Sequence, residues 1–165
     1  MVASKRGTGH GRNGHRTVVL GSDTESTGTF CWPVRVYFED TDAGGVVYHA
    51  NYLRYMERAR TEFFRLAGIV KMADLEASEP SCWAICEAKI RYRKPARLDD
   101  VLDVRTELVA MSGARIAATQ KIYRGSTLLV EGEIVACIVT LKGSPRRLPS
   151  ELSRLLTVFR AKTDT

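Results

Sequence analysis

Acidic, glycine and histidine residues that could act on a carbonyl group are concentrated in one short segment. Residues 39–51 read EDTDAGGVVYHAN. The two glycines let the backbone approach a ligand closely. A helix predicted to begin near Asn51 would point its first N–H groups, with their partial positive charge, at an oxyanion. A carboxylate facing that helix start could attack a carbonyl or activate water. The same acids could instead simply cap the helix, and local chemistry alone leaves both interpretations open.

The elements that flank this segment follow from hydrophobic periodicity. Residues 31–38 (CWPVRVYF) alternate and are rich in aromatic and β-branched side chains, so they predict a strand. Pro33 places that strand at a sheet edge or close to its own start. From Asn51 the period becomes helical. The apolar stripe consists of Tyr52, Met56, Ala59, Phe63 and Leu66, and Gly68 is the expected stop.

The second half of the chain predicts strands over 82–94, 100–111, 114–124 and 127–141, separated by turn signals. Short connections favour antiparallel pairing. A short helical turn before Pro80 and a short helix over 149–160 complete the order. The fold class is therefore α+β, with one long helix on a curved antiparallel sheet of about five strands. One helix covers neither both faces nor the edges of such a sheet, so we expect a homo-oligomer.

Composition bounds the organisation of the 165-residue chain. We expect a basic disordered tail over 1–29, one domain over 30–160 and a short tail over 161–165. The tail could be a nucleic-acid arm, although a solvated extension is favoured. No apolar run reaches the length of a spanning helix, and the basic N-terminus lacks the apolar centre of a secretory signal. The net charge of +6 favours an anionic ligand without choosing one.

The four cysteines form no CxxC pair, and no histidine lies at metal-finger spacing. Cys82 and Cys86 share a face of a predicted strand and are expected to be small buried apolar groups rather than disulfide or metal partners. A reduced, cytoplasmic setting is the default expectation.

A longer pattern surrounds the acidic segment and is similar to a known family. The stretch WPVRVYFEDTDAGGVVYHANYLRYMERARTEFFRLAGI from Trp32 to Ile69 resembles the YbgC-type acyl-CoA thioesterases, hot-dog proteins of the 4-hydroxybenzoyl-CoA thioesterase group. The resemblance continues through YRKPARLDD at 92–100 and RRLP at 146–149, and so covers roughly residues 31–150. It implies a hot-dog fold and hydrolysis of acyl-CoA, with neither a metal nor a cofactor.

The resemblance also implies site residues. Asp42 matches the family's catalytic carboxylate, which acts as nucleophile or general base. His49 matches the loop–helix junction, where a backbone N–H faces the thioester oxygen and the imidazole lies near the site. The rest of the motif is expected to shape the loop or bind substrate: Gly44, Gly45, Val46, Val47, Tyr48 and Asn51. Glu39 and Asp40 are expected to fix the loop or an intersubunit contact.

Some positions depart from the pattern or compete with it. Phe38 stands where relatives often carry a catalytic tyrosine, so it is excluded from the catalytic set; Tyr37 or Tyr48 could substitute, or the hydroxyl could be dispensable. Glu57 on the helix is a second candidate acid, but neighbouring arginines favour surface pairing. For the phosphates of coenzyme A the candidates are Lys94, Arg97, Lys142, Arg146 and Arg147.

Two other function classes stay open from the sequence. One is a hot-dog dehydratase or hydratase that acts on acyl thioesters. The other is a module that binds acyl-CoA, lipid or nucleic acid without turnover, although no nucleic-acid motif is present and nucleic acid is not expected. Proteins resembling this one accompany the Tol–Pal envelope system and can associate with the inner face of the membrane. The resemblance also suggests a tetramer, a dimer of dimers.

Overall fold

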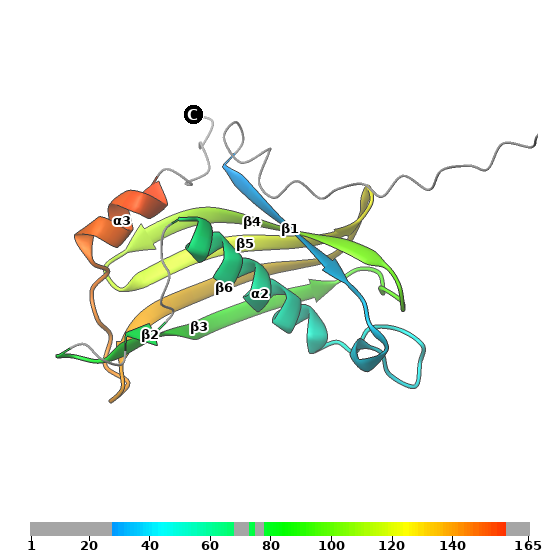
Figure 1. Ribbon diagram of the computed structural model, residues 1–165, viewed down its shortest axis with the longest axis horizontal. Coiled ribbons are helices and arrows are strands. Elements are labelled where there is room, and N and C mark those ends of the chain that lie inside the picture. Colours follow the sequence, from blue (N-terminus) through cyan, green and yellow to red (C-terminus); the bar gives the residue numbers. More distant parts are fainter. Residues whose placement is uncertain (1–27, 68–72, 75–77, 158–165) are drawn as a thin grey trace, which may run out of the picture.

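The computed structural model describes residues 28–67, 73–74 and 78–157. Two helices, a short 3₁₀ turn and six strands follow one another along these residues (Figure 1). Their order is β1 (Thr29–Arg35), η1 (Phe38–Asp40), α2 (Asn51–Leu66), β2 (Ala73–Asp74), β3 (Ser81–Tyr92), β4 (Val101–Ser112), β5 (Arg115–Arg124), β6 (Thr127–Thr140) and α3 (Ser150–Thr157).

All six strands belong to one antiparallel sheet with the order β1-β4-β5-β6-β3-β2. Strands β4, β5 and β6 form a meander joined by tight turns at Gly113 and Gly125, both with positive φ. Strand β1 adds to β4 as an edge strand, which confirms the position inferred from Pro33. Strand β3 pairs with β6 on the other side, so the segment that follows α2 returns to the far edge of the meander.

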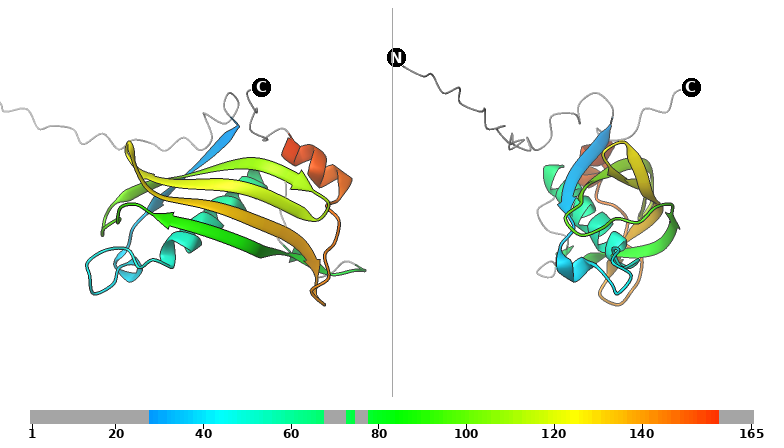
Figure 2. Two further views of the ribbon diagram at one scale, coloured as in Figure 1. Left: turned by 180° about the vertical axis from the view of Figure 1, so that it is seen from behind. Right: turned by 90° about the vertical axis from the view of Figure 1, so that its right-hand side faces the viewer.

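Helix α2 packs along the concave face of the sheet, and the strands curve around it in the end-on view (Figure 2, right). Its buried face includes Tyr55 and Phe64 in addition to most of the predicted stripe. Leu66, predicted to be buried, is 52% exposed, whereas the next residue, Ala67, is buried. The predicted α+β architecture of one long helix on a curved antiparallel sheet of five long strands is confirmed.

The boundaries of the elements differ in detail from the sequence prediction. The first strand ends at Arg35 rather than Phe38, because the chain turns into η1. Residues 73–74 pair with Ser81 and Cys82 as a strand, where the sequence suggests a helical turn. The predicted stop at Gly68, residues 1–27 of the predicted tail over 1–29, and the tail over 161–165 lie outside the described residues, while Thr29 already begins β1.

The cysteine prediction is wrong for Cys86, which is exposed and disulfide-bonded, and Cys82 is half-buried rather than buried. Cys86 of β3 and Cys137 of β6 form a disulfide. The register of these two strands shifts between Ile85 and Glu87, and this irregularity places Cys86 beside Cys137, with a Cα–Cα distance of 6.5 Å. Spacing along the sequence carries no sign of such a register shift, so the pairing could not be foreseen.

None of the helices in the described part of the chain combines the length and apolar character needed to cross a membrane.

Candidate active site

The acidic segment forms a small hairpin between η1 and α2. An isolated antiparallel bridge joins Thr41 to Val47. Inside it, the Asp42 N–H donates to the Val46 carbonyl (3.0 Å), and the Gly45 N–H donates to the Asp42 carbonyl (2.9 Å). Gly45 has φ +69°, a conformation that glycine adopts without strain. The hairpin therefore explains why a glycine stands at this position of the motif.

The Asp42 side chain lies on the exposed tip of this hairpin. Its Oδ1 accepts a hydrogen bond from the Gly44 N–H at 2.8 Å. A Cβ added to Gly44 would lie 3.0 Å from the same oxygen, closer than ordinary side-chain contacts allow. Gly44 thus lets the backbone hold one carboxylate oxygen and leaves the other to solvent or a ligand.

Asp40 supports the hairpin from inside and is only 6% exposed. Its carboxylate accepts the Tyr37 N–H (2.8 Å), and its carbonyl accepts both the Tyr48 N–H and the Asn51 side-chain amide (2.9 Å each). Buried polar groups that are hydrogen-bonded in this way fix a local conformation. This confirms the expectation that Asp40 fixes the loop, and it gives the buried Asn51 the same role.

Helix α2 begins without a side-chain cap. Its N-cap residue is Ala50, which has no polar side chain. The backbone N–H groups of His49 and Ala50 have no acceptor among the described residues, whereas the Asn51 N–H is bound to the Tyr48 carbonyl. Unsatisfied donors at a helix start bind anions and oxyanions. The junction where the resemblance places a catalytic N–H group is therefore free to donate.

A pocket of about 310 Å³ opens beside this helix start, lined by Val47, His49, Tyr52, Tyr92, Arg93, Lys94 and Pro95. The Tyr92 hydroxyl donates to the His49 carbonyl at 3.1 Å, and the two rings meet edge-on with centroids 6.4 Å apart. Sequence reasoning missed Tyr92, although it opens the YRKPARLDD segment. It lies at the site because β3 ends beside α2.

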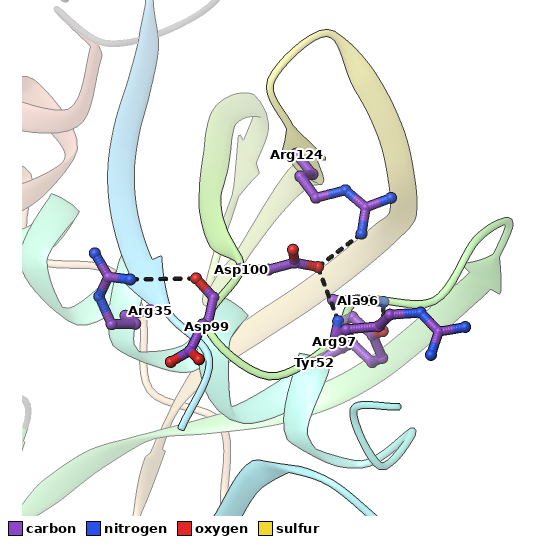
Figure 3. A network of polar contacts seen from close by, with 7 residues as sticks. All are labelled: Arg35, Tyr52, Ala96, Arg97, Asp99, Asp100 and Arg124. Atoms are coloured by element: carbon purple, nitrogen blue, oxygen red, sulfur yellow. Dashed lines mark hydrogen bonds and ion pairs between the residues drawn. The ribbon is translucent and has the colours of Figure 1, made fainter. Parts of the chain in front are cut away.

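The turn between β3 and β4, which lines part of this pocket, also anchors the helix start (Figure 3). The Ala96 N–H donates to the Tyr52 hydroxyl (2.8 Å), and the Val47 N–H donates to the Ala96 carbonyl (2.9 Å). Burial raises the pKa of Tyr52, so its hydroxyl stays protonated. Asp100 closes the turn by accepting bonds from the Arg97 N–H and the Arg124 guanidinium (Figure 3).

The structure brings some of the predicted site residues together and separates others. Asp42, Gly44, Gly45 and Val46 lie in the hairpin, while Val47 and His49 line the pocket. Tyr48 is half-exposed and lies beside His49, with ring centroids 4.4 Å apart.

The remaining candidates fall away from the hairpin or take other contacts. The Phe38 side chain is 80% exposed in η1. Glu57 accepts a hydrogen bond from the Thr61 hydroxyl rather than pairing with an arginine as predicted. Arg146 donates to the Ser81 side chain, at the opposite end of β3 from Tyr92. A strand of this length spans roughly 40 Å, so Arg146 and its neighbours Lys142 and Arg147 lie far from Lys94 within one protomer.

Comparison with known proteins defines the class to which this fold and site belong. The family model of the thioesterase-like superfamily matches residues 36–156. The acyl-CoA thioester hydrolase YbgC of Escherichia coli is 45% identical over 129 residues, which is 77% of this chain and 95% of that protein. The acyl-CoA thioesterase YbgC of Haemophilus influenzae is 42% identical over 124 residues, covering 74% and 90%.

A solved structure agrees with these sequence comparisons. The crystal structure of a probable thioesterase from Bartonella henselae superimposes with a TM-score of 0.66 and 35% identity, covering 73% of this chain and 98% of that one. The chain is therefore a hot-dog protein of the thioesterase-like superfamily. Within it, the chain belongs to the YbgC acyl-CoA thioesterases, which confirms the resemblance seen in the sequence.

Proposed function

We propose that this acyl-CoA thioesterase hydrolyses its substrates with the Asp42 carboxylate and the free N–H groups at the start of α2. The observation that supports this most is the arrangement of one hairpin, which presents an exposed carboxylate at its tip and leads directly into an uncapped helix start. The His49 N–H is the donor for the developing oxyanion. Such preorganised donors are commonly a large part of catalysis in acyl transfer.

Two routes fit this arrangement, and both balance. In the first, Asp42 attacks the thioester carbon, the C–S bond breaks, and water then hydrolyses the mixed anhydride to free acid and regenerated carboxylate. In the second, Asp42 takes a proton from the water that attacks the carbonyl. In either route coenzyme A leaves as a thiolate and takes up a proton.

The pocket beside the helix start is suited to the polar arm of coenzyme A. Arg93 and Lys94 bring two cations to its rim, and the aromatic rings of Tyr52 and Tyr92 provide its apolar wall. Guanidinium and ammonium groups bind phosphate oxygens strongly. Lys94 is therefore the best placed of the basic residues proposed for nucleotide binding, and Arg93 joins it although it also pairs with Glu131 at 2.7 Å.

The test compares free-thiol release from a panel of acyl-CoAs by wild type, Asp42→Asn and Asp103→Asn. Asp103 undergoes the same chemical change on β4, where it pairs with the half-exposed Arg105. Loss of at least about 10²-fold in kcat for Asp42→Asn alone supports the proposal. Equal activity of the two variants removes Asp42 from its role. Hydration of crotonyl-CoA without thiol release would instead indicate a hydratase.

A homodimer is proposed through the free edge of β3. In the described part of the chain, β2 covers only Ser81 and Cys82 of that edge. Most of the rest of this strand is exposed, including Ile85 and Tyr92 at 49% and 50%. Unpaired edges of this length are usually protected by another strand. Tyr92 contacts His49, so a dimer here would adjoin the site. A further association into tetramers and binding to the inner membrane stay predictions.

A further inference from the structure

Arg60 belongs to helix α2, at a position that the helical pattern predicts to be on the surface, but its side chain extends beneath the helix. Its side chain is half-buried, and its Nη1 donates to Gln120 Oε1 at 2.7 Å. Gln120 belongs to β5 and is fully buried. Arg60 therefore reaches from the helix onto the middle of the sheet.

The position of Gln120 is fixed by its other contacts. Its Nε2 donates to the Met56 carbonyl and to the Thr106 hydroxyl, both at 2.9 Å. Because the amide nitrogen is committed to these two acceptors, the amide oxygen must face Arg60. The guanidinium is thus held by a preorganised partner.

This polar group separates two apolar clusters beneath α2. One cluster surrounds the first half of the helix and includes Met56 and Ile122, and the other surrounds the second half and includes Phe63 and Leu108. Thr106 and Gln120 are buried on β4 and β5 at the level between them. Apolar side chains at these positions would join the two clusters into one core. Buried polar groups stabilise a fold only when all of them are hydrogen-bonded.

Arg60 is not satisfied in this way. Burial lowers the pKa of its guanidinium. Its single hydrogen bond goes to a neutral amide, and it forms no ion pair with any carboxylate of the described residues. The nearest acid on the helix, Glu57, is engaged with Thr61. A half-buried guanidinium without a carboxylate partner is available to bind an anionic group of a ligand.

The side of α2 that carries Arg60 faces β3. Phe64, one turn further on, stacks on Trp83 of β3 with ring centroids 5.0 Å apart. Ile85 and Ala88 pair with Ala136 and Ile134, which are buried under the helix, so they too face it. Yet Ile85 and Ala88 are exposed. Apolar sheet surface is therefore open on the side of the helix to which Arg60 belongs.

We infer that Arg60 determines substrate specificity by binding a carboxylate at the far end of the acyl group. The inference rests on the proposed function, in which the thioester carbonyl lies at the start of α2. The acyl group would then run along the helix over the open side of β3 and end at the guanidinium. The substrate class is the CoA monothioester of a dicarboxylic acid, and a bidentate guanidinium–carboxylate contact would recognise it.

The reach along the helix sets the length of the acyl group. Asn51 and Arg60 are separated by roughly 13 Å along the axis, at about 1.5 Å per residue. Long helical side chains lean towards the N-terminus, which shortens the gap to on the order of 8–10 Å. This distance fits an extended acyl chain with six to eight carbons, such as adipoyl or suberoyl.

The experiment measures kcat/KM for two matched pairs, adipoyl-CoA against hexanoyl-CoA and suberoyl-CoA against octanoyl-CoA. We expect wild type to prefer the carboxylate-bearing member of at least one pair by about tenfold or more. In Arg60→Met with Gln120→Leu, which replaces both polar partners by apolar groups of similar size, the preference should reverse. The matched control is Arg58→Met, because Arg58 is exposed on the other side of α2.

The outcomes are distinguishable. A wild type that hydrolyses no acyl-CoA overturns the proposed function and this inference with it. A wild type that hydrolyses the plain acyl-CoAs as well as the dicarboxylic ones overturns the inference alone, and this comparison needs no variant that might fold poorly. A preference that persists in the double variant, with an unchanged unfolding midpoint, shows that recognition lies elsewhere.

Discussion

The Tyr52 hydroxyl accepts the backbone N–H of Ala96 at 2.8 Å and so joins the first turn of α2 to the turn that follows β3 (Figure 3). Both residues are buried. The same turn receives the Val47 N–H through the Ala96 carbonyl. The two contacts hold the helix start, the hairpin and the end of β3 at fixed positions.

Removal of this hydroxyl tests its importance for the site. Tyr52→Phe leaves the Ala96 N–H buried without a partner, which costs about 1–3 kcal/mol. We expect the free energy of unfolding to fall by that amount and kcat to fall with it. Urea unfolding and steady-state kinetics measure the two effects. Tyr123→Phe is the control, since Tyr123 lies on the outer face of the sheet, with the Arg105 guanidinium 4.3 Å above its ring. A normal kcat in a destabilised Tyr52→Phe would show that the contact serves only stability.

Two glycines with similar backbone conformations allow the effect of backbone strain on stability to be distinguished from an effect on catalysis. Gly45 in the hairpin has φ +69° and Gly113 in the β4–β5 turn has φ +58°, and neither has an atom within 4 Å of an added Cβ. Alanine at either position should destabilise the fold by about 1 kcal/mol through strain alone. We expect only Gly45→Ala to lower kcat as well, because it distorts the hairpin that carries Asp42. Equal activity of both variants would contradict a role for hairpin geometry.

The buried Tyr55 gives a signature at alkaline pH. Burial raises the pKa of its hydroxyl, and the neighbouring Asp40 carboxylate raises it further. Below the pKa of about 10 that tyrosine has in the unfolded chain, the hydroxyl is neutral in both states, so it contributes no pH dependence to the stability. Above it, only the unfolded chain ionises at first. Stability is therefore lost as pH rises, by up to about 1.4 kcal/mol per pH unit. Tyr55→Phe should remove this contribution to the slope of unfolding free energy against pH, measured by urea unfolding between pH 9 and 11, roughly the range around the unfolded-state pKa. If wild type and Tyr55→Phe lose stability equally with rising pH, Tyr55 is not the group responsible.

The disulfide between Cys86 and Cys137 closes a loop with a sequence separation of 51. Chain-entropy considerations attribute about 4 kcal/mol of stabilisation to a loop of this length. We expect Cys86→Ser to lower the free energy of unfolding by about 2–4 kcal/mol, in line with this value. Thiol titration of the denatured, unreduced protein should find two of the four cysteines reactive. Four reactive thiols would show that the bond does not form, and Cys82→Ser is the control for the substitution itself.

The free edge of β3 predicts the state of association. Ile85 and Val109 are apolar strand residues with almost equal exposure, 49% and 47%, but only Ile85 lies on β3. Glutamate at position 85 should shift the protein towards monomers, because it would bury a charge in the proposed interface. Glutamate at position 109 should not. Light scattering after size-exclusion chromatography measures the masses of both variants. If Ile85→Glu is still a dimer, the free edge of β3 is not the dimer interface.

Much of the fold was predictable because its signals are local. The period of α2 and the turn signals around Gly113 and Gly125 each act within a few residues, and they located the helix and the meander. The family motif identified the segment from Asp42 to Asn51. What it could not supply is the support beneath that segment. The contacts of Asp40 with Tyr37, and of Tyr52 with Ala96, depend on packing between elements.

Two contacts outside the reach of the sequence analysis share one physical cause. The disulfide of Cys86 and the hydrogen bond of Arg60 both join residues to partners on distant strands. A register shift in β3 brings Cys137 to Cys86, and the position of β5 under the helix brings Gln120 to Arg60. Neither event has a signature within the neighbouring sequence.

The sheet order has a consequence for how the chain reaches its native state. Strands β4, β5 and β6 are neighbours both in sequence and in space, so they close through short turns, while β1 and β3 must join them across long stretches of chain. Contacts of high sequence separation are the slow ones to form. We therefore expect the meander to assemble first and β3 to dock late. Since β3 also carries Tyr92 and the edge proposed as a dimer interface, a nascent chain would complete its pocket and this edge only when folding is nearly complete.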